Sequence, residues 1–194
     1  MKKERLQQIE KIFEKHEFIA WKKDIIQANV TEKEIQELID KEIIWENYPN
    51  VLVFDIVNDD EFYEAQMYSQ LKPYWGLSAI MLHDLTTNVA HYHYFLSRTK
   101  NNPLAENIKY HIKNYNEEEL EYINSWFSRK ILVTNLEKTI IDCLAYNEFD
   151  SYLEEVLANY MENDRKDIEK LKSYAAKYQI NLSNYIVLKE ADKE

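Results

Sequence analysis

The sequence predicts an α+β protein with two domains. Its 194 residues fit one large domain or two small ones, by the usual prior of roughly 100–200 residues per domain. Apolar residues recur at helical spacing in both halves, and short apolar runs bounded by turn residues indicate strands. An acidic break, Asn58-Asp59-Asp60-Glu61, separates the halves. We therefore predict a first domain over residues 1–57 and a second over residues 58–194.

Three helices are expected at the start of the chain. Apolar residues at helical spacing predict an amphipathic helix over residues 2–15 and a shorter one over 21–28. The third, over 31–40, begins with the pattern Thr31-x-x-Glu34. In this capping box a hydroxyl and a carboxylate satisfy free amides at the helix end.

A β-hairpin is expected directly after the third helix. Two apolar runs, residues 43–45 and 51–54, flank the turn-rich stretch 46–50, which contains Pro49. Three helices followed by a hairpin is the order of a winged helix-turn-helix domain, and we predict that fold for residues 1–57.

The second domain is expected to be rich in helices around a small antiparallel sheet. Pro73 ends the helix that follows the acidic break, and Asn101-Asn102-Pro103 marks a turn. A short apolar segment, residues 185–188, lies near the end of the chain. The first predicted helix of this domain ends near residue 71, and four more cover 75–84, 134–146, 152–161 and 165–178. The predicted strands cover 89–98, 107–115 and 131–133.

Composition excludes several classes of protein. Gly76 is the only glycine, which excludes P-loops, dinucleotide fingerprints and nucleophile elbows because each needs several glycines. Cys143 is the only cysteine, so an internal disulfide and a multi-cysteine zinc site are excluded. No apolar run approaches the ~18 residues of a membrane helix, and the start of the chain shows no apolar signal region. We expect a soluble, cytoplasmic protein.

Two segments of the second half resemble a known family. Residues 74–86, YWGLSAIMLHDLT, look like the "Y…G…SAL…HGLT" segment of AbiEi-type antitoxins, and residues 131–142, ILVTNLEKTIID, are similar to their "v.vs.pEkTilD" segment. The order of elements also fits these proteins, which carry an N-terminal winged helix, a helix-rich α/β antitoxin domain and closing helices. The resemblance therefore covers nearly the whole chain.

The resemblance implies a bacterial antitoxin from a two-gene toxin–antitoxin and phage-defence system. Its first domain would bind DNA upstream of its own operon and repress it. Its second domain would antagonise an AbiEii-like nucleotidyltransferase toxin, by direct or indirect action. The chain could act as a homodimer, although the sequence shows no dimer seam. Such proteins are not enzymes of ordinary metabolism, so we expect no catalytic residues, no cofactor, no metal and no membrane partner.

Two positions depart from the family pattern. Asp84 replaces the glycine of HGLT, so we expect its backbone to be left-handed, a conformation that Asp and Asn tolerate better than other non-glycine residues. The hairpin stretch 47–51 contains no basic residue, whereas family members commonly carry a basic, glycine-containing stretch there.

The charges of the first domain partly favour and partly oppose DNA binding, which needs cations near the phosphates. Residues 31–60 contain two Lys or Arg and nine Asp or Glu. The main cations therefore lie in the first two helices, with Lys22 and Lys23 at the start of the second, where phosphate contacts are often made. One alternative is an acidic protein-interaction module that sequesters a partner without binding DNA. The candidate DNA contacts are Lys2, Lys3, Arg5, Lys22, Lys23, Thr31, Lys33 and Gln36.

The candidate antitoxin residues lie in the two family-like segments. Glu137 follows Thr134 by three residues, which is also a capping-box pattern. Lys138 and Asp142 can pair across one helical turn, and with Thr139 we expect them largely outside the buried stripe of their helix. The candidate set is Ser78, His83, Glu137, Lys138, Thr139 and Asp142.

Histidines offer weaker alternatives. Ser78 and His83 lie about 140° apart around a helix, so a local dyad is excluded, and His83 is best explained as a helix-end cap. His91 and His93 share one strand face, and His111 on a neighbouring strand could complete a three-histidine metal site. The simpler interpretation is a half-exposed aromatic face, and a hydrolase or metalloenzyme lacks any motif in this sequence.

Overall fold

The computed structural model describes residues 1–99, 105–146 and 151–185, and the predicted turn at 101–103 and residues 186–188 of the apolar segment lie outside them. The protein mixes helices and small sheets, as predicted. It divides into two compact units. Unit 1 comprises Met1–Leu71 with Asn124–Lys130, and unit 2 comprises the remainder.

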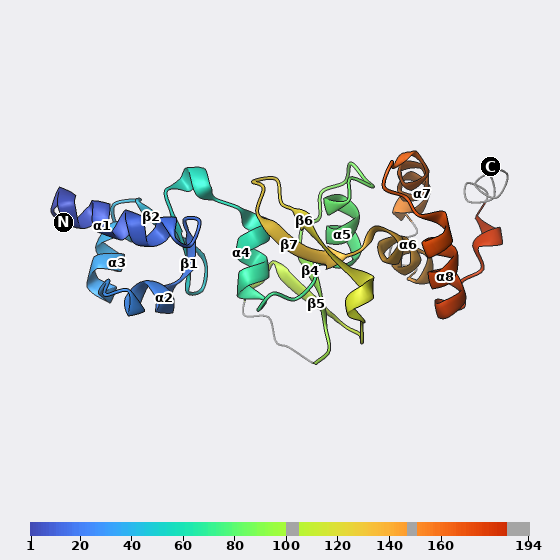
Figure 1. Ribbon diagram of the computed structural model, residues 1–194, viewed down its shortest axis with the longest axis horizontal. Helices are drawn as coiled ribbons and strands as arrows, with labels where there is room; N and C mark the ends of the chain where they lie inside the picture. The colour runs from blue at the N-terminus through green and yellow to red at the C-terminus, as the bar shows by residue number, and fades with distance from the viewer. Residues whose placement is uncertain (100–104, 147–150, 186–194) are drawn as a thin grey trace. The chain divides into compact units, whose positions relative to one another are not determined.

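Unit 1 contains the three predicted helices, the predicted hairpin and one unpredicted strand (Figure 1). Its three-stranded sheet has the order β1-β3-β2, and both pairings are antiparallel. The added strand, β1, pairs Ile19 with Val53 and Trp21 with Val51. The elements are α1 (Lys3–Glu14), β1 (Ile19–Trp21), α2 (Lys22–Gln27), α3 (Glu32–Ile39), β2 (Ile44–Tyr48), β3 (Val51–Phe54), a 3-10 turn η1 (Ile56–Asn58) and α4 (Glu61–Tyr68).

The core of unit 1 joins the three helices to the sheet. Phe13 of α1 lies against Phe54 of β3, with ring centroids 5.3 Å apart. Ile25 of α2 and Ile35 of α3 are fully buried in the same cluster. Burying such side chains is worth about 1.5–3 kcal/mol each relative to exposure, so the apolar stripe of each helix fixes its packing.

The predicted capping box at α3 is confirmed. The Thr31 hydroxyl accepts a hydrogen bond from Glu34 N at 3.2 Å, and Thr31 N donates to the Glu34 carboxylate at 2.8 Å. We expect Thr31→Ala to lower the free energy of unfolding by about 1 kcal/mol because one helix-end amide loses its partner. Urea denaturation measures this loss. Lys33→Ala on the same helix is the control, and an equal effect from both variants would contradict the prediction.

Residues 124–130, although distant in sequence, are tied to the rest of unit 1. The Asp60 carboxylate accepts from Ser125 Oγ at 2.5 Å and from Arg129 Nη1 at 3.4 Å. The Arg129 Nη2 group also donates to the carbonyl of Glu17 at 2.8 Å. Trp126 packs edge-on against the Phe62 ring at 4.9 Å. Unit 1 is therefore completed by a discontinuous piece of chain.

Unit 2 contains two pairs of strands, linked by the segment around Tyr74 and surrounded by helices. The strand β6 was not predicted; the other strands and the helices agree with the sequence analysis within a few residues at their ends. The elements are α5 (Gly76–Leu82), β4 (His93–Ser97), β5 (Ile108–Ile112), a 3-10 turn η2 (Glu117–Glu119), β6 (Leu120–Asn124), β7 (Lys130–Thr134), α6 (Leu136–Ala145), α7 (Leu153–Glu162), α8 (Ile168–Tyr178) and a 3-10 turn η4 (Leu182–Asn184).

The prediction of an antiparallel sheet holds only in part for unit 2. Strands β6 and β7 follow one another through the short turn 125–129, a connection suited to antiparallel pairing. Strands β4 and β5 are parallel, with His93 opposite Ile108, which the sequence did not predict. Tyr74, fully buried, forms bridges to both Phe95 of β4 and Val133 of β7.

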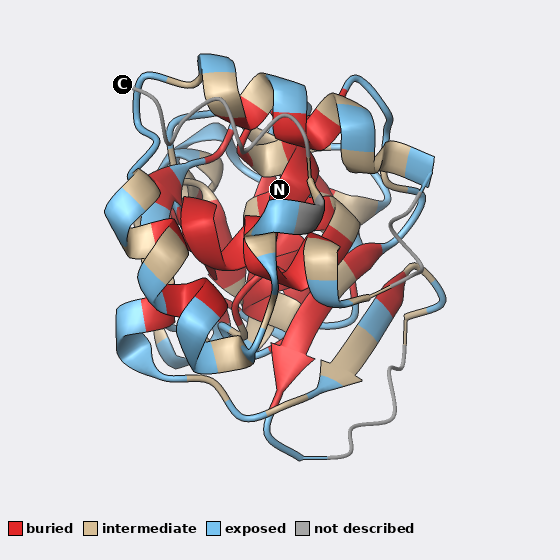
Figure 2. Ribbon diagram, turned by 90° about the vertical axis from the view of Figure 1, so that its right-hand side faces the viewer, coloured by how far each residue is buried: buried red, intermediate tan, exposed pale blue. Residues whose placement is uncertain are grey.

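The helix α6 lies at the centre of the unit 2 core. It packs against α5, α7 and α8, so its sides are covered, and Figure 2 shows buried residues gathered inside the surrounding helices. The short helix α5 begins at Gly76, whose left-handed φ of 59° suits a residue without a Cβ. It is followed by Asp84 with φ 58°, which confirms the expected left-handed backbone.

Candidate functional site

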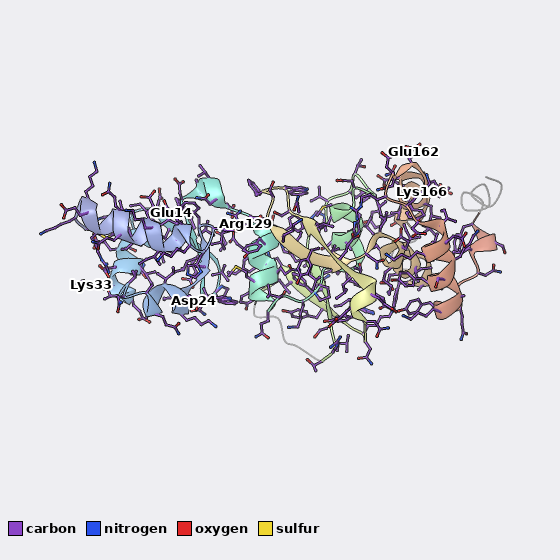
Figure 3. The ribbon with its side chains drawn as sticks, viewed as in Figure 1. Glu14, Asp24, Lys33, Arg129, Glu162 and Lys166 are labelled. Carbon is purple, nitrogen blue, oxygen red and sulfur yellow. The ribbon has the colours of Figure 1, made fainter. Side chains whose placement is uncertain are left out.

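The outward face of α3 carries more acidic than basic side chains, as its sequence predicts. Glu32, Lys33, Gln36 and Asp40 are exposed, and Glu37 is half-exposed. Gln36 Nε2 donates to Asp40 at 2.8 Å, and Glu37 pairs with Lys41 at 2.6 Å. Lys33 extends from this face without a hydrogen bond or ion pair to any described residue (Figure 3). Within this helix face, Lys33 is therefore the cation left available to an outside partner.

Two candidate DNA contacts are already used inside unit 1. Arg5 Nε donates to one oxygen of Glu34 at 2.7 Å and Nη2 to the other at 3.1 Å, while Nη2 also donates to the carbonyl of Asn29. The hydrogen bond from Arg5 lowers the pKa of Glu34 to about 2. The Thr31 hydroxyl likewise donates a hydrogen bond to the Glu34 carboxylate. These residues fasten α1 to the start of α3.

The remaining candidate cations of unit 1 lie at the starts of α1 and α2. Lys2 and Lys3 are exposed, Lys22 is half-exposed and Lys23 is exposed. The Lys23 ammonium lies 5.8 Å from the centroid of the Trp21 ring. The side chains of Lys2, Lys3 and Lys22 form no hydrogen bond or ion pair with any residue that the structure describes. Their charges are therefore available to an anionic partner.

In unit 2 the six candidate antitoxin residues are all buried. The expectation that Lys138, Thr139 and Asp142 lie outside the buried stripe is wrong, because each is only 1% exposed. Three helices cover α6, so its polar residues have no side left to face water. Ser78, His83 and Glu137 are at most 3% exposed.

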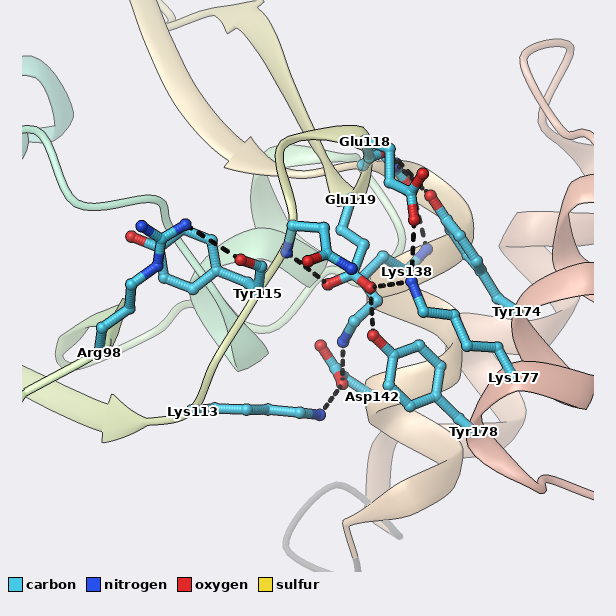
Figure 4. Close-up of polar contacts among 12 residues, drawn as sticks. Arg98, Lys113, Tyr115, Glu118, Glu119, Lys138, Asp142, Tyr174, Lys177 and Tyr178 are labelled. Carbon is cyan, nitrogen blue, oxygen red and sulfur yellow. Dashed lines mark hydrogen bonds and ion pairs between the residues drawn. The ribbon is translucent and has the colours of Figure 1, made fainter.

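Asp142 is the centre of a buried charge network (Figure 4). One carboxylate oxygen receives hydrogen bonds from Lys138 Nζ and, at 3.1 Å, from Lys113 Nζ. The other oxygen receives the indole N–H of Trp75 at 2.9 Å. Burial lowers the pKa of Lys138 against the opposing effect of Asp142. Burial acts the same way on Lys113, but there the attraction of Asp142 wins and the pKa is raised.

A second carboxylate, Glu119, extends this network on the side of α8. Fully buried itself, it accepts from Lys177 Nζ at 2.8 Å and from the hydroxyl of Tyr178. The Tyr178 ring lies 4.9 Å from Lys138 Nζ. Burial raises the pKa of Glu119, but the hydrogen bonds from Lys177 and Tyr178 outweigh it and lower the pKa overall. The network thus joins the residue after β5 with η2, α6 and α8.

Ser78 and His83 link α5 to two different strands. The Ser78 hydroxyl donates to the carbonyl of Tyr92 and accepts from Tyr94 N. His83 Nε2 lies 2.7 Å from the carbonyl of Thr134, so this nitrogen carries the proton. Burial lowers the pKa of His83, which favours the neutral ring.

The predicted capping box between Thr134 and Glu137 is wrong. Thr134 is still the last residue of β7, so Asn135 takes the cap position and accepts from Lys138 N at 3.0 Å. The Glu137 carboxylate instead accepts from Asp167 N at 3.0 Å and pairs with Lys170 at 3.2 Å. Glu137 therefore ties α6 to the start of α8.

The histidines considered for a metal site have other neighbours. His93 Nδ1 lies 3.3 Å from the hydroxyl of Tyr74, and the His111 ring stacks on Trp75 at 4.1 Å. Among the described residues, no group of three or more His, Cys, Asp or Glu side chains is placed to hold a metal ion. The described helices also include none long and apolar enough to span a bilayer.

Unit 1 contains a polar group that sequence reasoning did not single out. Glu64 on α4 is fully buried, and its carboxyl accepts from Asp60 N and from Asn47 Nδ2, each at 3.0 Å. Burial raises its pKa to about 8, and a hydrogen bond to Asp59 acts in the same direction. Glu64 follows the acidic stretch 59–61 closely, and nothing in the sequence there indicates that its side chain is buried.

No protein-family model and no curated protein matches this sequence.

Proposed function

We propose that this protein is an AbiEi-like antitoxin, in which unit 1 binds the operator upstream of its own gene and unit 2 counters a nucleotidyltransferase-like toxin. The observation that carries the proposal is the order α1-β1-α2-α3-β2-β3 with a sheet ordered β1-β3-β2. That order supports a winged helix-turn-helix fold for unit 1, a fold in which the third helix reads the major groove. A cytoplasmic location and a homodimer on repeated sites belong to the same proposal.

The free cations of unit 1 support phosphate contacts. Lys22 and Lys23 begin α2, and Lys33 stands on the outward face of α3 beside Gln36. Lys2 and Lys3 begin α1. Arg5 and Thr31 act within the fold, so they support the interface by fixing α1 against α3.

The antitoxin half of the proposal rests on the resemblance of residues 74–86 and 131–142 to the family segments. These segments contain α5, β7 and the start of α6, the buried framework of unit 2. The six candidate residues would therefore shape the surface that meets the toxin or its target, without contacting it. Growth of cells that express the cognate toxin, with and without this chain, tests this half.

Operator binding is tested by fluorescence anisotropy. Purified protein is titrated with DNA from upstream of its own gene and with scrambled DNA of the same length, at about 50 and 200 mM salt. We expect operator-selective binding that weakens with salt. The variant Lys22→Ala/Lys23→Ala should bind more weakly and reduce the logarithmic salt slope by about 0.9 per lost phosphate contact.

The control is Lys166→Ala, which removes a positive charge from an exposed position between α7 and α8 in unit 2. It should leave both the affinity and the salt slope unchanged. Equal binding of operator and scrambled DNA, or no binding by folded protein at micromolar concentration, would contradict the repressor half of the proposal.

A second candidate function is an acidic interaction module that sequesters a basic partner directly. The observation that favours it is the outward face of α3, where Glu32, Glu37 and Asp40 outnumber Lys33. Co-purification of the co-expressed partner, with no operator complex at low salt, would favour this function over DNA binding.

A further inference from the structure

Unit 1 contains an open cavity of about 700 Å³, and the functions above assign no ligand to it. Its volume falls within the range of small-molecule sites, roughly 300–1,000 Å³. The residues that surround it come from the end of β1, from α2, from the start of α3, from the β2–β3 turn, and from α4 with the segment that follows it. They are Trp21, Lys22, Lys23, Ile26, Glu32, Asn50, Met67, Gln70 and Leu71.

The apolar part of this cavity is left facing water. Leu71 is 62% exposed and Ile26 is 37% exposed. Trp21 and Met67 line this cavity and also a smaller one of about 310 Å³, so they form the wall between the two. The indole of Trp21 is thus a planar surface at the edge of a hollow, the position in which an aromatic side chain can stack a ligand ring.

The backbone at the cavity rim is well fixed. Gln70 and Leu71 both have left-handed φ angles, 62° and 59°, held by hydrogen bonds from Gln70 N to Met67 O and from Leu71 N to Gln66 O. Across the cavity, Asn50 is held by a hydrogen bond from Lys22 N to its carbonyl at 2.8 Å. The polar side chains therefore project from an ordered frame, a condition for a preformed site.

Most of the polar side chains that line the cavity have no partner among the residues that the structure describes. Within the described part of the chain, the side chains of Lys22, Glu32, Asn50 and Gln70 form no hydrogen bond or ion pair, and Lys23 has only its distant contact with Trp21. Two cations, two amides and one carboxylate thus face a cavity that has an aromatic wall.

We propose that this cavity binds a nucleoside monophosphate. Each part of such a ligand has a matching group: Trp21 can stack on the base, and the amides of Asn50 and Gln70 can hydrogen-bond to its edge. The Glu32 carboxylate can accept from ribose hydroxyls, as acidic residues do in dinucleotide sites. Lys22 and Lys23 supply the charge for the phosphate. The site shares Lys22 and Lys23 with the proposed operator contacts, whereas Trp21, Asn50 and Gln70 belong to the cavity alone.

Isothermal titration calorimetry on the full chain, without DNA, tests the proposal. The probes are AMP, GMP, CMP and UMP, with adenosine and inorganic phosphate as separate arms. We expect one-to-one, saturable binding of at least one nucleotide, and binding at least tenfold weaker for adenosine and for phosphate. Trp21→Ala and Lys22→Ala/Lys23→Ala should each weaken nucleotide binding at least tenfold, since base stacking and phosphate charge each contribute that much.

Matched variants separate a lost site from a lost fold. Trp126→Ala removes an exposed tryptophan of unit 1 that does not line the cavity. Lys2→Ala/Lys3→Ala removes an adjacent lysine pair that does not line it either, and both variants should bind nucleotide as the parent does. Leu71→Glu, at an exposed rim position, should repel the phosphate while leaving the core intact.

Three results would overturn the proposal: no saturable heat with any nucleotide from folded protein, phosphate binding as tightly as every nucleotide, or a Leu71→Glu variant that binds like the parent. Loss of operator binding with nucleotide binding intact would reject only the repressor function, and the reverse would reject only this site.

Discussion

Replacing Asp142 with alanine should lower the free energy of unfolding by about 3–5 kcal/mol, the usual cost of removing one partner of a buried ion pair. The change leaves Lys138 buried without its carboxylate, and it also removes the acceptor of the Trp75 indole N–H and of Lys113. Chemical denaturation followed by circular dichroism measures the loss.

A double variant distinguishes the ion pair from simple packing. Asp142→Leu combined with Lys138→Met replaces both buried charges with apolar groups of similar size, and such replacements are often close to neutral. The double variant should therefore be clearly more stable than Asp142→Ala. A cost below about 1 kcal/mol for Asp142→Ala, typical of an exposed pair, would show that the network is open to water.

Glu64→Gln should make the protein more stable above pH 8 and have little effect below pH 4.5. The pKa of Glu64 rises from its ordinary 4.5 to about 8 in the folded protein, so the folded state keeps a proton that the unfolded chain releases. The stability that this proton provides is complete below pH 4.5 and is lost as the pH rises to about 8. At about 1.4 kcal/mol per pKa unit, the loss reaches about 4–5 kcal/mol at most.

The measurement is the unfolding temperature of both proteins from pH 4 to 9. The glutamine amide can accept from Asp60 N and donate to Asp59, but its NH2 group replaces the oxygen that accepts from Asn47 Nδ2. The change of stability with pH, and not a constant difference between the two proteins, therefore reports the charge. Glu14→Gln, at an exposed position on α1, is the control and should follow the parent protein. Parallel decline of the parent and Glu64→Gln across this range would contradict the assignment.

Local sequence pattern predicted the elements that carry their own signals. Helix α3 has a capping box and an apolar stripe, and the hairpin has two apolar runs around Pro49. Strand β1 was missed because it has only three residues, Ile19–Trp21, and is defined by its pairing with β3. Strand β6 was missed because its sequence, LEYIN, lacks a clear apolar alternation.

The six candidate residues of unit 2 lie in an environment that the sequence did not predict. Helical periodicity treats a polar residue as an outward residue, so Lys138 and Asp142 were expected at the surface. Their burial depends on Lys113, Glu119 and Tyr178, which come from other elements. A helix with charged residues can be buried on all sides only when distant segments supply the opposite charges. The spacing of residues within the helix does not indicate those segments, so the burial of α6 could not be predicted from its own sequence.

The discontinuity of unit 1 has a consequence during protein synthesis. Residues 1–71 emerge from the ribosome before residues 124–130, which contain Ser125 and Arg129. Until those residues arrive, Asp60 lacks both of these partners, and the carbonyl of Glu17 lacks its guanidinium donor. Domains usually fold in the order of translation, but here the N-terminal unit reaches its complete set of contacts only when about two thirds of the chain has been made.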